Sequence, residues 1–177
     1  MSAKSSTVTT ASTPERTNKA VVRRFFEEVL SDGNLPVTDE LFAADYTGHD
    51  PNLPPLPTGP EGVTLFTFAS RTAFPDQRVT VEDLFAEGDR VAVRFTLHGT
   101  HLGALLDVAP TGKHLAVQGL AIYRLAGGRI VEGWVDLDMI GLLDQIGLLA
   151  QLGAAPSPPP PVNAAVAEDS VHTHCRV

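Results

Sequence analysis

The chain has 177 residues, 43% of them hydrophobic, with 13 Lys and Arg against 21 Asp and Glu, giving a formal net charge of −8. This size supports one domain with a real core and hardly two. An acidic chain with scattered arginines argues against a nucleic-acid surface, which needs clustered Lys and Arg. The only cysteine, Cys175, lies near the end of the sequence, so no intrachain disulfide can form.

No apolar run reaches the roughly 20 residues that span a bilayer, and the first residues lack the pattern of a secretion signal. We therefore expect a cytoplasmic protein that binds neither nucleic acid nor membrane. Residues 1–12 are Ser, Thr and Ala with one Lys, which predicts a disordered leader. The proline-rich run 153–177 predicts a disordered tail. The folded domain is expected over residues 13–152.

Two longer helices are predicted in the first half of the chain. Thr13, followed by proline and glutamate, is typical of a helix start. Apolar residues then recur at three- and four-residue spacing, which predicts a helix to about Leu30, before the turn at 31–34. A further helix is predicted to begin at 58–61 and to end before Phe74, with Phe66 facing inward.

Between these helices the sequence predicts a short helix capped by Thr38, running through Leu41 and Phe42 and ending near Tyr46. The following segment, 49–60, carries five prolines and predicts an extended loop that walls a pocket.

From Gln77 the apolar residues alternate, as is typical of strands. The run 91–97 is followed by a loop at 109–113, a strand over 115–125, a tight hairpin at Gly127 and Gly128, and a strand over 130–138. Helices followed by an antiparallel meander indicate an α+β domain with its helices on one face of the sheet.

Five motifs together resemble one protein family: NKAVVRRFFEEVL, LFAADYTGHDP, GTHLG, PTGKHLAVQGLAIYRL and GGRIVEGWVDLDMIGLLDQIG. Their order and spacing over roughly residues 17–150 are similar to the SnoaL-like polyketide cyclases, also called ester cyclases, of the NTF2-like superfamily. The resemblance implies a cone-shaped α+β barrel, in which a bent antiparallel sheet packs on three N-terminal helices around a ligand cavity. It also implies a homodimer formed through the outer face of the sheet.

The last strand carries the first catalytic candidates, Asp136 and Asp138. In a regular strand both would share a face with Ile130, Glu132 and Trp134. A carboxylate in an apolar cavity has a raised pKa and becomes a usable acid or base near neutrality. Asp138 immediately precedes an apolar helix, so an N-cap is the competing interpretation for it.

One departure from the family concerns the chemistry. In an ungapped alignment of this region, the catalytic aspartate of the family's aldol cyclases falls on Val135, one position before Asp136. A shift of one residue reverses the face of a strand, so either a bulge returns Asp136 to the cavity or the protein uses different chemistry.

The histidines of the GTHLG region are further candidates. In a regular strand His98 and His101 lie on opposite faces, unless Gly99 forms a bulge. The resemblance favours His101 as a proton or hydrogen-bond donor to a substrate oxygen. The competing interpretation is a strand-end histidine bonded to the backbone.

Tyr46 and His49 are expected at the pocket mouth, where the tyrosine hydroxyl could hold a ketone or epoxide oxygen, or simply pack under the loop. Trp134 is expected to line the cavity, and Gln118 either orients a ligand or bonds to the sheet edge. Three potential metal ligands lie on the tail without a second cluster, so no metal centre is predicted there: His172, His174 and Cys175. The sequence shows no phosphate-binding glycine loop and no nucleophile elbow.

These features predict a cofactor-independent cyclase of natural-product biosynthesis that acts on a hydrophobic, oxygen-bearing substrate. Asp136 would accept a proton while His101 or Tyr46 donates one, in an aldol closure or in attack on an epoxide. The alternatives are an epoxide hydrolase, a keto-steroid-type isomerase, or a binding protein without catalysis, because a fold does not fix a function.

Overall fold

The computed structural model describes residues 13–105 and 108–149. In chain order its elements are α1 Pro14–Arg24, the π-helix η1 Phe25–Ser31, the 3₁₀ helix η2 Leu35–Val37, α2 Thr38–Leu41, β1 Phe42–His49, α3 Pro60–Ala73, β2 Arg78–Glu87, β3 Arg90–Thr100, β4 His114–Ala126, β5 Arg129–Leu137 and α4 Met139–Ile146. The expected leader and tail, including the candidate ligands His172, His174 and Cys175, lie outside the described residues.

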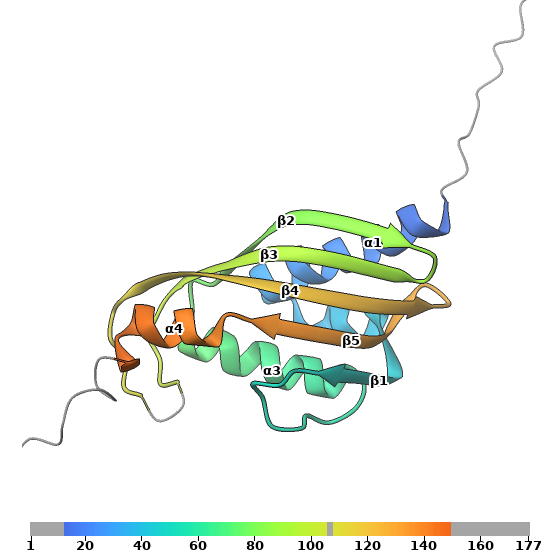
Figure 1. Ribbon diagram of the computed structural model, residues 1–177. Coiled ribbons are helices and arrows are strands. Elements are labelled where there is room, and N and C mark those ends of the chain that lie inside the picture. The colour runs from blue at the N-terminus through green and yellow to red at the C-terminus, as the bar shows by residue number, and fades with distance from the viewer. Residues whose placement is uncertain (1–12, 106–107, 150–177) are drawn as a thin grey trace, which may run out of the picture.

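The five strands form one bent sheet in the order β1-β5-β4-β3-β2. The pairs β2–β3, β3–β4 and β4–β5 are antiparallel, whereas β1 joins β5 in parallel. Figure 1 shows α1 along one side of this sheet and α3 beside β1 and β5. The predicted α+β architecture, a bent antiparallel-dominated sheet packed on N-terminal helices, is confirmed.

The first helix begins as predicted and continues as a π-helix. The Thr13 hydroxyl accepts a hydrogen bond of 3.3 Å from the Arg16 backbone N–H, which makes Thr13 the N-cap. The apolar stripe runs into η1, where Phe26 packs against Phe95 of β3 with ring centroids 5.1 Å apart. Phe25 meets Tyr123 of β4 edge to face at 5.9 Å. These aromatic contacts join the helix to the inner face of the sheet.

The short helix predicted after Thr38 is wrong beyond Leu41. Thr38 is not a cap, because its hydroxyl donates to the Leu35 carbonyl at 2.7 Å. Phe42 begins strand β1 instead, with Phe42 and Tyr46 buried and their rings edge to face at 4.8 Å. The strand forms through parallel pairing with β5, far along the chain, so local spacing does not reveal it.

The proline loop and α3 follow the prediction. Residues 50–59 form no regular element, and α3 begins at Pro60 and ends at Ala73. Gly59, with φ +78°, donates its N–H to the Tyr46 carbonyl at 2.8 Å, which fastens the end of the loop to β1. A side chain at Gly59 would place Cβ 2.5 Å from the Ala44 carbonyl oxygen, so glycine is required there.

The face of β5 differs from the prediction because the strand contains a bulge. Its pairing with β4 shifts by one residue at Val131. Ile130, before the bulge, is fully buried on the inner face. Trp134 and Asp136, after it, pair with residues of β4 that are exposed on the outer face. The expectation that Ile130, Trp134 and Asp136 share one face is therefore wrong, whereas Val135 lies on the inner face.

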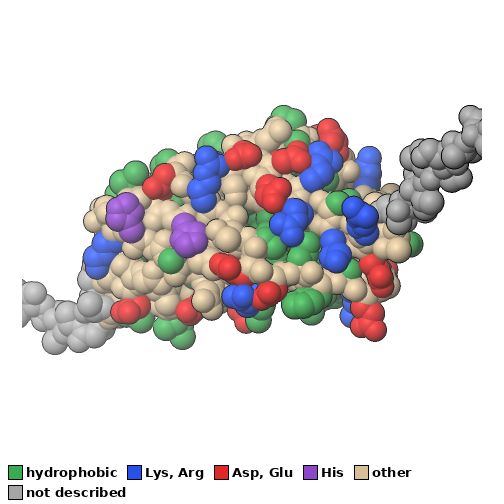
Figure 2. Space-filling view, turned by 90° about the horizontal axis from the view of Figure 1, so that it is seen from above, with side chains coloured by type: hydrophobic (Ala, Val, Ile, Leu, Met, Phe, Trp, Pro, Cys, Tyr) green, Lys and Arg blue, Asp and Glu red, His purple; other side chains and the backbone are tan. Residues whose placement is uncertain are grey.

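None of the described helices is long and apolar enough to cross a membrane. In the face shown in Figure 2, acidic and basic side chains are interspersed.

Candidate functional site

A cavity of about 790 Å³ lies between the inner face of the sheet and the helices η1 and α3. Its size falls in the range of small-molecule sites. The proline loop forms one wall, as predicted, and Phe66 of α3 lines the cavity. Pairing between β1 and β5 ends at His49 and Trp134. Beyond this pair, the edge of β5 that faced β1 has no neighbouring strand among the described residues. Residues from both faces of β5 line the cavity, so the cavity opens at this unpaired edge.

Tyr46 projects from β1 into the cavity. Its ring lies over two facing glycines of the β1–β5 pair, since a Cβ atom would come within 3.0 Å of the phenol oxygen at Gly48 and within 2.8 Å at Gly133. Burial raises the pKa of Tyr46 to about 12. The phenol therefore stays protonated at neutral pH and can serve as a hydrogen-bond donor.

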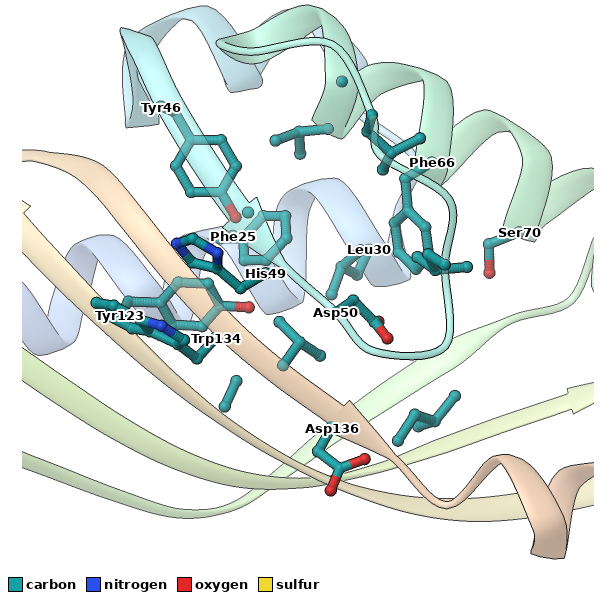
Figure 3. Close-up of a pocket in the computed structure, with 18 of the residues that line it drawn as sticks. Phe25, Leu30, Tyr46, His49, Asp50, Phe66, Ser70, Tyr123, Trp134 and Asp136 are labelled. Atoms are coloured by element: carbon teal, nitrogen blue, oxygen red, sulfur yellow. The ribbon is translucent and has the colours of Figure 1, made fainter.

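Tyr123 of β4 joins Tyr46 at the same end of the cavity (Figure 3). Burial raises its pKa well above the usual value, and the charges of Tyr46 and Asp50 add to this. Neither phenol hydroxyl forms a hydrogen bond with another described residue. The cavity thus holds two phenols whose hydrogen-bonding capacity is left for a ligand.

Two carboxylates line the cavity. Asp50 begins the proline loop, is half-buried, and accepts a 2.8 Å hydrogen bond from the Asn52 N–H. Its negative charge contributes to the raised pKa of the Tyr123 phenol. Asp136 is exposed and lies at the mouth, on the side of β5 facing away from the helices.

Asp138 caps α4 and does not line the cavity. Its carboxylate accepts a 2.8 Å hydrogen bond from the Gly141 N–H. The capping interpretation therefore describes Asp138, and its expected part in catalysis has no geometric support.

His49 and Trp134 stack at the mouth, with ring centroids 5.3 Å apart. The His49 Nε2 atom lies 3.1 Å from Glu132, which also accepts hydrogen bonds from Arg124 at 3.0 and 2.9 Å. These two partners hold the pKa of Glu132 below its usual value. The pair forms an ordered rim whose imidazole is already engaged with a carboxylate.

His101 lies outside the cavity. It is fully buried, and its Nδ1 atom accepts a 3.3 Å hydrogen bond from the Thr111 N–H, with the Thr111 hydroxyl at 3.0 Å. Its ring packs near Phe74 at 5.7 Å. This matches the backbone-bonded histidine of the competing interpretation, and His101 is not among the residues that line the cavity. His98 and Gln118 are exposed on the outer face and do not line the cavity either.

The end of the cavity away from the tyrosines holds a second polar group (Figure 3). Ser70 of α3 donates a 2.5 Å hydrogen bond to the side-chain oxygen of Gln77, which is 2% exposed. The Gln77 amide nitrogen donates in turn to the Leu30 carbonyl at 2.9 Å. Polar groups therefore stand at both ends of a mostly apolar chamber.

The sequence did not indicate Tyr123 or Gln77 as site residues, and it marked Asp50, beside His49, only as an aspartate able to face a pocket, without a role. Tyr123 belongs to the inward-facing set of an alternating strand, a signal that was present in the sequence. Asp50 and Gln77 lie outside regular elements, where no periodicity indicates which way a side chain points. Within residues 13–105 and 108–149, no group of three His, Cys, Asp or Glu side chains could hold a metal ion.

The bent sheet, the helices on one side and the cavity between them define an α+β domain of the NTF2-like class. A protein from Catenulispora acidiphila with a ketosteroid isomerase-like fold superposes with a TM-score of 0.63 at 23% identity, covering 77% of this chain and 97% of its own. This likeness concerns the fold alone. No curated protein matches the chain.

Residues 20–146 match the family model described as SnoaL-like polyketide cyclase, and the chain belongs to this family. IdmH of Streptomyces antibioticus, a proposed polyketide cyclase, is 32% identical, with a TM-score of 0.63, and 77% of this chain and 99% of IdmH are covered. A proposed SnoaL-like polyketide cyclase of Jannaschia sp. CCS1 is 26% identical, with a TM-score of 0.69 and coverage of 82% and 97%. These similarities support a cyclase-type role.

Proposed function

We propose that the protein closes a ring in a hydrophobic, oxygen-bearing substrate of natural-product biosynthesis, using general acid–base catalysis without a cofactor. One observation carries this proposal: two phenol hydroxyls without partners among the described residues share an apolar cavity with a carboxylate. Phenols that remain protonated suit a developing oxyanion, and the carboxylate suits a carbon acid.

The proposed step is an intramolecular aldol closure. Asp50 removes a proton from a carbon next to a carbonyl, and the resulting enolate carbon attacks a second carbonyl of the same chain. A carbon–carbon bond forms, and the second carbonyl oxygen takes a proton from Tyr46. The proton held by Asp50 then restores the Tyr46 phenol, so no proton is gained or lost. Tyr123 donates a hydrogen bond beside Tyr46, and the apolar walls hold the chain folded.

Asp136 remains the alternative base. At the inward position where the family's aldol cyclases carry their catalytic aspartate, this chain has Val135. A carboxylate must therefore approach the substrate from another element. Asp50 is half-buried in the loop wall of the cavity and contributes to the raised pKa of Tyr123, whereas Asp136 is exposed on the outer side of β5.

Exchange of carbon-bound hydrogen for deuterium tests this proposal without knowledge of the natural substrate. We would incubate the protein with the aryl ketone 2-acetonaphthone in deuterated water and follow its mass, having shown binding by quenching of Trp134, the single tryptophan. We expect exchange above buffer, with a loss of about 10²-fold or more in Asp50→Asn. Asp136→Asn is the matched control and should retain exchange.

Two results would contradict the assignment. Full exchange in Asp50→Asn, with loss in Asp136→Asn, would move the base to the mouth. Bound ketone without exchange in the wild-type protein would leave a binding protein as the better interpretation.

Opening of an epoxide is the second candidate, favoured by the absence of an inward carboxylate at Val135. Tyr46 would donate to the epoxide oxygen while a substrate hydroxyl attacks carbon. In labelled water, cyclisation leaves the product unlabelled, whereas hydrolysis incorporates the label.

We also propose that the protein is a homodimer formed through the outer face of the sheet. Phe85, Ala92, Ile122 and Trp134 lie in register across four strands and form an apolar row. The rows on either side carry both signs of charge. A second copy related by a twofold axis presents the same row in the opposite direction, which suits a self-complementary contact.

A further inference from the structure

We infer that Ser70 and Gln77 form a subsite that selects a hydrogen-bond donor, so that the substrate carries a hydroxyl or N–H group at the end opposite its reacting carbonyl. This deepens the proposed function by naming a feature of the substrate and rests on it only for the position of the reacting carbonyl.

The direction of each hydrogen bond in the subsite follows from a backbone group. The Leu30 carbonyl is close to the end of η1 and can only accept hydrogen bonds. The Gln77 group 2.9 Å from it must therefore be the amide nitrogen, which fixes the orientation of the amide. Arg71 donates to the same carbonyl at 3.2 Å, which further anchors this end of the helix.

With the amide fixed, the side-chain oxygen of Gln77 faces Ser70 and needs a donor. Ser70 supplies its only hydroxyl hydrogen, at 2.5 Å. If that hydrogen turned to a ligand, the Gln77 oxygen would lose its partner in a side chain that is 2% exposed, which is unfavourable. Ser70 is therefore held as an acceptor toward the cavity.

The position of the pair sets the substrate requirement. Ser70 lines the cavity, and Figure 3 shows it at the end away from Tyr46 and Tyr123, with Phe66 and Leu30 between. A ligand that spans the chamber would place one oxygen at the phenols and its other polar group at Ser70. A carbonyl or ether facing the Ser70 hydroxyl would meet its lone pairs, whereas a ligand hydroxyl could donate to Ser70 and complete the network.

Binding of small aromatic probes tests the subsite without turnover. We would measure dissociation constants by calorimetry for 2-naphthol, for the larger 2-methoxynaphthalene and for the smaller 2-fluoronaphthalene, both of which lack a donor. The wild-type protein should bind 2-naphthol more tightly than either of the other two probes. In Ser70→Ala the ratio of these dissociation constants should fall about tenfold, which corresponds to the loss of one well-made hydrogen bond. Ser70→Thr, which keeps a hydroxyl, should retain the preference.

Two controls separate this inference from the rest of the site. Thr72→Ala removes an exposed hydroxyl of the same helix, bonded to the Phe68 carbonyl, and should leave every constant unchanged. Tyr46→Phe should retain the naphthol preference while losing ketone exchange. A preference unchanged in Ser70→Ala, or abolished in Tyr46→Phe alone, would overturn the subsite while leaving the proposed acid–base chemistry intact.

Discussion

Replacement of Tyr46 by Phe separates a functional hydroxyl from a structural one. The hydroxyl makes no hydrogen bond with a described residue, whereas the ring packs on Phe42 and over Gly133. Tyr46→Phe keeps these ring contacts. At neutral pH we expect the free energy of unfolding to change by less than about 1 kcal/mol. The exchange rate of the bound ketone should fall about 10²-fold, as when one oxyanion donor is removed.

The same substitution has a predicted effect on alkaline stability. The Tyr46 pKa is raised from 10.0 to about 12 in the folded protein, because burial disfavours the phenolate. The resulting stabilisation is complete below pH 10 and is lost as the pH rises toward 12. Each pKa unit is worth about 1.4 kcal/mol, so wild-type protein loses about 3 kcal/mol that Tyr46→Phe does not lose.

Urea unfolding of both proteins at about pH 8, 10 and 11 measures the onset of this loss, which should reach about 1.4 kcal/mol at pH 11. Ultraviolet absorbance of the phenolate gives an independent titration, because the chain has only two tyrosines. Equal alkaline losses in the two proteins would refute the claim that the phenol is buried at the cavity wall. A loss of 2 kcal/mol or more at neutral pH, on the scale of a broken buried hydrogen bond, would show that the hydroxyl supports the fold.

Three further variants test the rest of the account. Phe85→Glu places a charge in the apolar row of the outer face and should convert the dimer to a monomer, as measured by sedimentation. A wild-type protein that is itself monomeric would contradict the proposed interface. Asp138→Ala removes the N-cap of α4 and should lower the free energy of unfolding in urea by about 1 kcal/mol, with exchange activity retained. Loss of activity in a folded variant would instead indicate a catalytic role for Asp138. Gly133→Ala puts Cβ 2.8 Å from the Tyr46 oxygen and 2.9 Å from the Tyr123 ring, so both phenols must shift and exchange should fall at least tenfold. Tyr46→Phe combined with it should add less than it does alone, whereas two fully additive losses would show that the glycine does not act through Tyr46.

The sequence predicted those parts of the fold that local chemistry determines. Thr13 capped the first helix, Pro60 began α3, and Gly127 and Gly128 joined β4 to β5. Strand β1 was missed because its partner is distant in sequence and pairs in parallel. A bulge in β5 was one of the alternatives, but its position at Val131 could not be predicted, because a β-bulge carries no residue signature there. It places Asp136 on the face opposite Ile130 instead of returning it to the inner face.

The sequence predicted those site residues whose position follows from the alternation of side chains along a strand or from a place in the proline loop. Tyr46, His49, Phe66, Trp134 and Asp136 all line the cavity. The histidine beyond the end of β3 could not be placed, because a motif does not show where the loop after a strand folds. The side chain of His101 is buried and contacts the hydroxyl of Thr111, ten residues further along the chain. The pair Ser70 and Gln77 could not be predicted, because its arrangement depends on the Leu30 carbonyl, which only the folded structure brings next to Gln77.

The most direct test of the cavity phenols is the carbon-13 resonance of the carbonyl in bound, labelled 2-acetonaphthone. Two phenol donors polarise a carbonyl, so the account predicts a downfield shift in the wild-type protein that moves back partly in Tyr46→Phe and further when Tyr123→Phe is added. An identical resonance in all three proteins, with the ketone bound in each, would contradict the claim that these hydroxyls hold the substrate oxygen.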